Sequence, residues 1–258
     1  MATAPLPSTN SGISPVPAQA APLSEAVRIV NTFIAPSKTF TDLRRSAAWW
    51  APFLLMVIVS IVFVSIAGQK VGFRKITENQ LQMQPKQADA LEKMPPEQRE
   101  QQMNIREKFT KGIAYAFPVL QLIGLLIIAA ILFGTFKLVG GADASFKVSL
   151  AIVVYASLPG LIKVLLAIAS LLAGASADSF TFQNPIGSNI GYYLNPADSP
   201  FLYSLGSSFD VFMLWTLALT AIGFTCVSKV KKGTAFAIVF GWWLLVVLIG
   251  AGAAAAFS

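Results

Sequence analysis

Hydrophobic residues along this chain gather in five long blocks, which polar segments separate. Each block holds about 20 residues or more, enough for a helix to cross roughly 30 Å of hydrocarbon. Lipid offers the backbone no hydrogen-bonding partners, so each block is expected to pair its own amides as a helix. The pattern predicts an all-α integral membrane bundle of five transmembrane helices. The blocks cover approximately residues 49–68, 113–136, 148–174, 208–227 and 235–257.

The segment before the first block divides into two parts. Residues 1–22 contain Pro, Ala, Ser and Thr but no charged side chain, which predicts a disordered tail and no signal peptide. The membrane domain then covers residues 23–258. It opens with apolar residues at 4-3-4 spacing, which lie on one face of a helix. We predict an interfacial amphipathic helix in the headgroup plane, and packing against the bundle remains an equal alternative. These apolar residues are Leu23, Val27, Val30 and Ile34.

Two longer polar segments join the blocks. Residues 69–112 are rich in Gln, Glu and Lys, which predicts a solvated helical arm that runs into the second span. Residues 175–207 contain Asn, Pro, Gly and aromatic residues but no Lys or Arg. We expect this segment to rest on the membrane interface, with a ligand-binding lid as the less favoured alternative.

The distribution of Lys and Arg predicts the orientation. Short segments near Lys137 and Lys147, and the cluster from Lys229 to Lys232, are basic, whereas residues 175–207 are not. Short basic loops remain on the cytoplasmic side of a membrane. The N-terminus is therefore expected to be cytoplasmic and the C-terminus outside.

Composition narrows the function. Of the 258 residues, 55% are hydrophobic and 12% charged, against about 25% charged residues in soluble domains. The net charge of +7 comes without a compact basic patch, which favours lipid headgroups over nucleic acid as the partner. The chain has no His and only Cys226, so an internal disulfide and Cys/His metal sites are excluded. We expect no metal and no cofactor.

Motifs for catalysis are also missing from the sequence. There is no phosphate-binding loop, and the commonest general base, His, is absent. The expected spans contain almost no ionisable residues. We therefore predict that the protein is not an enzyme. A weaker alternative is an enzyme acting on lipid headgroups, which would need Asp178, Asp198 and Asp210 to lie together.

Lys163 is the exception within the third block. It follows Pro159 and Gly160, which weaken the helix, and a lysine at mid-membrane costs about 2.5–3.5 kcal/mol. One interpretation is a polar cavity used by a small-solute or ion transporter. We favour the other, in which the side chain snorkels past a kink or binds carbonyls freed by the proline. A salt bridge to Asp210 is disfavoured, because helical side chains lean toward their own N-terminus.

Three sequence elements resemble the bacterial branch of the Yip1 domain family, over roughly residues 25–255. They are Phe33 to Phe40 with Trp49 to Pro52, Val154 to Pro159 with its Tyr155, and Phe209 to Trp215. The resemblance implies a five-span bundle with a cytosolic N-terminus, in the inner membrane of a bacterium. Eukaryotic members act in vesicle traffic and associate with small GTPases. Their Asp-Leu-Tyr-Gly-Pro element is absent here, so GTPase binding is not expected.

These observations favour a non-enzymatic multi-pass protein that serves as a scaffold or accessory partner of other membrane proteins, with transport or trafficking machinery as candidates. Its partners would be membrane lipids and either other membrane proteins or a second copy of itself. The alternative function is transport through the broken third span. The candidate functional residues are Lys163, Pro159, Tyr155 and Asp210.

Overall fold

The computed structural model describes residues 21–140 and 145–257. The predicted disordered tail lies outside these residues apart from its last two positions. The described residues are mostly helical, with two short 3-10 helices and no named strand. The helices are α1 (Glu25–Ile34), α2 (Pro36–Asp42), α3 (Trp50–Lys70), α4 (Phe73–Gln82), α5 (Pro85–Glu92), α6 (Pro96–Gly140), α7 (Phe146–Ala156), α8 (Pro159–Leu172), η1 (Ala177–Ser179), η2 (Ile190–Tyr193), α9 (Pro200–Ser208), α10 (Val211–Val227) and α11 (Lys232–Phe257).

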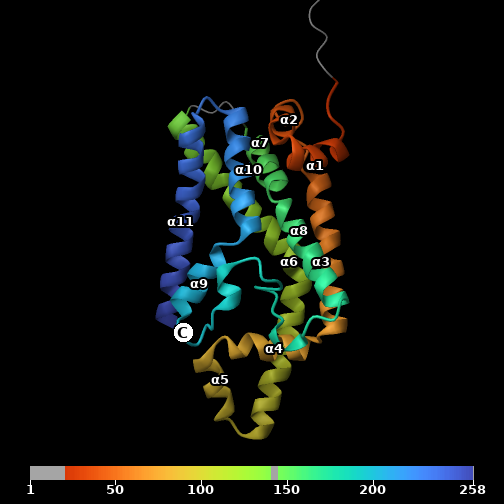
Figure 1. Ribbon diagram of the computed structural model, residues 1–258, viewed down its shortest axis with the longest axis vertical. Coiled ribbons are helices and arrows are strands. Elements are labelled where there is room, and N and C mark those ends of the chain that lie inside the picture. The colour runs from red at the N-terminus through yellow and green to blue at the C-terminus, as the bar shows by residue number, and fades with distance from the viewer. Residues whose placement is uncertain (1–20, 141–144, 258) are drawn as a thin grey trace, which may run out of the picture.

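The long helices run side by side along the long axis of the molecule (Figure 1). Within the described residues, four helical segments are long and apolar enough to cross a membrane: α3, α6, the joined α7 and α8, and α11. Helix α10 is apolar but has only 17 residues. These helices confirm the prediction of an all-α membrane bundle.

The polar arm forms one end of the molecule. Residues 73–92 fold into α4 and α5, and α6 then runs for 45 residues from the arm into the bundle. Pro96 is the first residue of α6, where the missing backbone N–H of proline has no intrahelical partner to lose. Figure 1 shows α4 and α5 below the bundle and α1 and α2 at its opposite end.

The main hydrophobic core lies toward the α1–α2 end. Residues 148–156 of α7 are all buried, and α2 packs on α10 through the fully buried Phe40. Gly223 of α10 makes this approach close, because a Cβ atom there would lie 2.4 Å from Ile152 and 3.2 Å from Phe40. Phe136 and Phe224 stack with ring centroids 4.2 Å apart.

The segment 175–207 differs from the expected interfacial loop. Its last part forms α9, which packs against η2 and α11. In Figure 1, α9 lies beside the lower part of α11, and α10 lies beside the upper part. Helix α10 thus covers most of the predicted span 208–227, and α9, which was not predicted, precedes it across a break at Phe209. The segment can enter the bundle because its amide and hydroxyl side chains bind one another, as described below.

Candidate functional site

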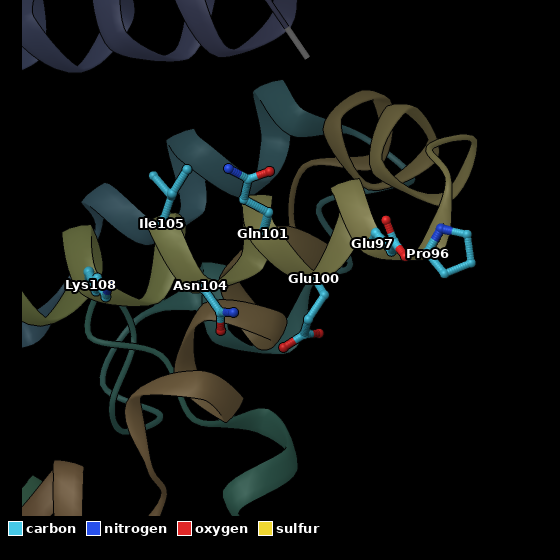
Figure 2. A pocket seen from close by; sticks show the side chains of 7 residues that line it. All are labelled: Pro96, Glu97, Glu100, Gln101, Asn104, Ile105 and Lys108. Atoms are coloured by element: carbon cyan, nitrogen blue, oxygen red, sulfur yellow. The ribbon is translucent and has the colours of Figure 1, made fainter.

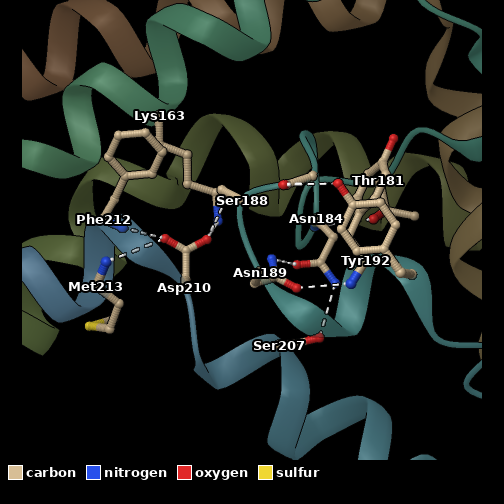
Figure 3. Close-up of polar contacts among 12 residues, drawn as sticks. Lys163, Thr181, Asn184, Ser188, Asn189, Tyr192, Ser207, Asp210, Phe212 and Met213 are labelled. Carbon is tan, nitrogen blue, oxygen red and sulfur yellow. Dashed lines mark hydrogen bonds and ion pairs between the residues drawn. The ribbon is translucent and has the colours of Figure 1, made fainter.

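Lys163 and Asp210 form an ion pair inside the bundle. Helix α7 ends at Ala156 and α8 begins at Pro159, which places Lys163 one turn after the break. The Lys163 Nζ atom lies 2.8 Å from Asp210 Oδ2, and the two side chains are 21% and 7% exposed. Figure 3 shows the lysine reaching across from α8 to the start of α10.

Asp210 has further donors around its carboxylate. Its Oδ1 atom accepts hydrogen bonds from the backbone amides of Phe212, at 2.9 Å, and Met213, at 3.3 Å. The hydroxyl of Ser188 donates to Oδ2. Asp210 is therefore the N-cap of α10 and the counter-charge of Lys163 at once. Four donors surround one carboxylate, which stabilises its ionised form.

This pair corrects the sequence interpretation of Lys163. The preferred expectation, a lysine that snorkels or binds freed carbonyls, is wrong, because the ammonium group binds a carboxylate. In the predicted span 208–227, Asp210 stands at one end, away from the middle of the third span where Lys163 lies. Instead, α9 occupies that part of the bundle, and α10 begins farther along its axis (Figure 1). The two charges therefore meet.

A chain of side-chain amides continues from this pair into the loop segment (Figure 3). Asn189 forms a β-bridge with Asp210, and its Nδ2 atom donates to Asn184 Oδ1 at 2.9 Å. Asn184 Nδ2 donates to Ser207 Oγ at 3.1 Å, and Asn189 Oδ1 accepts from the amide of Tyr192 at 2.9 Å. These bonds join the loop, α9 and the start of α10 into one polar network. These asparagines could not be singled out from the sequence, because the composition of the segment is that of any polar loop.

Tyr155 belongs to a second ionic cluster, at the α1–α2 end. Its hydroxyl donates to Glu25, whose other oxygen lies 2.9 Å from Arg28 Nη1. Arg28 also donates to Asp42 Oδ2 from Nε at 2.9 Å and from Nη2 at 2.7 Å. Thr39 of α2 donates to the backbone carbonyl of Arg28. The cluster ties α1 and α2 to α7.

The roles of Arg28 and Asp42 were not predicted from the sequence. Arg28 is 1% exposed, although it lies off the helical face formed by the apolar residues Leu23, Val27, Val30 and Ile34. Burial alone would lower the pKa of Arg28, but the hydrogen bond and charge of Asp42 raise it above its usual value. No spacing rule links positions 28 and 42 across the turn at Ala35, so the sequence carries no signal for this pair. The polar face of α1 turns inward, and its apolar residues Val27, Val30 and Ile34 are exposed.

The three carboxylates of the lipid-enzyme alternative have separate partners. Asp178 lies 2.8 Å from Lys75 Nζ, Asp198 accepts from Asn195, and Asp210 binds Lys163. The hydrogen bond from Lys75 lowers the pKa of Asp178 and raises that of Lys75, and both groups lie on the arm end. The structure does not bring these acids to one shared site.

Two hollows differ in how they are built. One, of about 780 Å³, lies along the arm part of α6, and Figure 2 shows all seven of its side chains on that single helix. Its Glu100 is already paired with Arg74 at 2.7 Å. The other, of about 500 Å³, is a cleft between α3, α4, α6, α8 and the loop segment, and Lys163 is part of its wall. The cleft is the more defined of the two, because five elements enclose it.

Comparison with known proteins agrees with this architecture. The model of the Yip1 domain family matches residues 30–254, which includes the α2, α7–α8 and α10 elements described above. No curated protein and no solved structure matches the chain. Because the match covers most of the sequence and the described helices form a membrane bundle, the chain belongs to the Yip1 domain family.

Proposed function

We propose that this protein is a non-enzymatic scaffold or accessory partner of other membrane proteins. The observation that carries the proposal is the pairing of its interior charges. Lys163 with Asp210, and Arg28 with Asp42, each hold helices together. Charges used in this way stabilise the bundle, and the outer helix surfaces are then the surfaces through which it acts. Transport or trafficking machinery would supply the partners.

The outer surfaces suit contacts with other membrane helices. Helix α11 packs on α9 and α10, while Leu244, Val246 and Ile249 remain exposed. The helix ends in a run of Gly and Ala from Gly250 to Ala256, and such small residues allow another helix to approach closely. This surface supports interaction with a second membrane protein or a second copy of the chain.

The proposal includes five spans, with α10 and the preceding α9 together forming the fourth. The N-terminus would be cytoplasmic and the C-terminus outside, in a bacterial inner membrane. The end of α6, which carries Lys137, and the junction of α10 with α11, which carries Lys229 to Lys232, lie at the same end of the bundle as α1 and α2 (Figure 1). Helix α1 would lie in the headgroup plane with its exposed apolar face in lipid.

Labelling of single cysteines tests this topology. In a Cys226→Ser background, we expect Ala90→Cys on α5 and Ala256→Cys at the end of α11 to react with a membrane-impermeant thiol reagent from outside intact cells. Gly233→Cys, at the start of α11, should react only after the membrane is opened. Labelling of Ala90→Cys and Ala256→Cys from opposite sides would contradict five spans.

Native mass spectrometry tests the scaffold role. When the protein is released from its own membrane within lipid nanodiscs, we expect a large fraction to carry a second protein, either a different membrane protein or another copy. If only the monomer were detected, in a membrane sample that also contains the candidate partner proteins, the result would argue against the proposal. Identification of the bound protein names the machinery.

We do not extend the proposal to transport. Lys163 is neutralised by Asp210, and most of the cleft that it lines is apolar. A pathway for a polar solute requires hydrated walls, and this cleft has a different character.

A further inference from the structure

The apolar cleft continues into a more polar hollow on the arm. This polar hollow is a third one, with a volume of about 300 Å³, and it lies between α4 and α6. Both hollows are lined by Gln80, Phe109 and Thr110, and the Thr110 hydroxyl donates to Gln80 Oε1 at 3.5 Å at their junction. The two form one groove with an apolar part inside the bundle and a polar part on the arm.

The groove crosses the level at which the chain changes from polar to apolar. On α6 its lining extends from Ile105 to Phe117, which is about 18 Å of helix. No charged residue occurs between Lys111 and Lys137, so Lys111 marks the headgroup level on this helix. The apolar part therefore lies at the depth of acyl chains, and the polar part lies at or beyond the headgroups. The length is comparable to one leaflet of a bilayer about 30 Å thick in its hydrocarbon.

The wall of the groove is accessible from the surroundings. Phe109, Ile113 and Phe117 line it and are 69%, 42% and 49% exposed. A molecule in the surrounding bilayer could therefore reach the apolar part sideways, between α3 and α6. Because these side chains lie at the depth of acyl chains, an acyl chain can occupy the apolar part of the groove.

Charges along the groove are of one sign. Arg106 lines its polar part and Lys163 its apolar part, and none of the described lining residues of either hollow is acidic. Lys163 is neutralised by Asp210, whereas Arg106 has only the neutral amide of Gln87 as partner, at 3.1 Å, among the described residues. The uncompensated positive charge is therefore at the headgroup end.

We propose that the groove binds an anionic membrane phospholipid. Arg106 binds the phosphate, Gln80 and Thr110 contact the glycerol region, and one acyl chain lies along the apolar wall toward Lys163. A guanidinium group suits this role because it donates several hydrogen bonds to a phosphate. The site is independent of the scaffold role, since it needs no partner protein.

Native mass spectrometry of the full-length protein in detergent tests the site. The probes are phosphatidylglycerol and phosphatidylcholine with identical acyl chains. Both lipids offer the phosphate, but the cationic choline group is repelled by Arg106, so we expect phosphatidylglycerol to bind about tenfold more tightly. Arg106→Gln should remove this preference. Lys108→Gln is the matched control, because Lys108 stands two residues away and lines the hollow of Figure 2 but neither part of the groove. It should change binding by less than about twofold.

A second variant tests the acyl-chain part. Ala114→Leu fills part of the apolar wall and should weaken both lipids, and a thermal unfolding curve confirms that the variant is folded. Excess soluble glycerol 3-phosphate should not compete, because it lacks the chains. Equal weakening by Arg106→Gln and Lys108→Gln, no preference for phosphatidylglycerol, or effective competition by glycerol 3-phosphate would overturn the proposal. A change in the dimer fraction without a change in lipid binding would assign the groove to a second copy and would also overturn it.

Discussion

Replacing Asp210 with asparagine is expected to destabilise the bundle by about 3 kcal/mol, because removal of one partner leaves the other charge buried and unpaired. Lys163 is only 21% exposed and has no second carboxylate among its described contacts. The side-chain oxygen of asparagine still allows capping of α10, so the substitution isolates the charge from the cap. Equilibrium unfolding in mixed micelles, followed by circular dichroism, measures the loss.

Three further variants define the origin of this effect. Lys163→Met should be less harmful than Asp210→Asn, because Asp210 keeps Ser188 and two backbone amides as donors. The double variant should recover much of the stability, since it contains no unpaired charge. Asp178→Asn makes the same substitution in the exposed pair with Lys75 and should behave like the wild-type protein. Equal stability of Asp210→Asn and Asp178→Asn would show that the interior pair has no structural role.

Replacing Asp42 with alanine is expected to release α1 and α2 from the bundle, with a loss of about 3–5 kcal/mol. Arg28 is 1% exposed and donates two of its hydrogen bonds to Asp42 Oδ2. Without this carboxylate the guanidinium group keeps only Glu25 as an ionic partner, and the preferred outcome is movement of α1 into solvent or lipid headgroups. Hydrogen exchange should then increase in α1 and α2 before it increases in α7.

Arg45→Met provides the control for this experiment. Arg45 lies 4.0 Å from the same carboxylate but is 41% exposed, so its removal should change little. Arg28→Lys keeps the charge and loses the planar group with its several donors, and we expect an intermediate loss. If Asp42→Ala left exchange in α1 unchanged, or if Arg45→Met had the larger effect, the cluster would not hold these helices.

The helical membrane class was predictable because it depends on the length and hydrophobicity of single segments. The family was predictable because it depends on short sequence elements in a fixed order. A helix in lipid satisfies its own backbone, so a block of apolar residues of sufficient length indicates a span without knowledge of its neighbours. The same reasoning placed the arm before the second block and the break at Pro159. The element from Val154 to Pro159 pointed to the Yip1 domain family, and the family match confirms this.

The two ionic clusters and the groove could not be predicted in this way. Asp210 meets Lys163 because α9 packs beside α11 ahead of α10, which places the start of α10 inside the bundle, and no property of residues 208–227 alone encodes that placement. Arg28 is buried because α2 folds back over α1, although its helical position is that of a solvent-exposed residue. Contacts between elements depend on how rigid helices pack, at separations in sequence that no periodicity describes. Hydrophobic pattern therefore sets which segments become membrane helices, and packing sets which of their few polar groups meet.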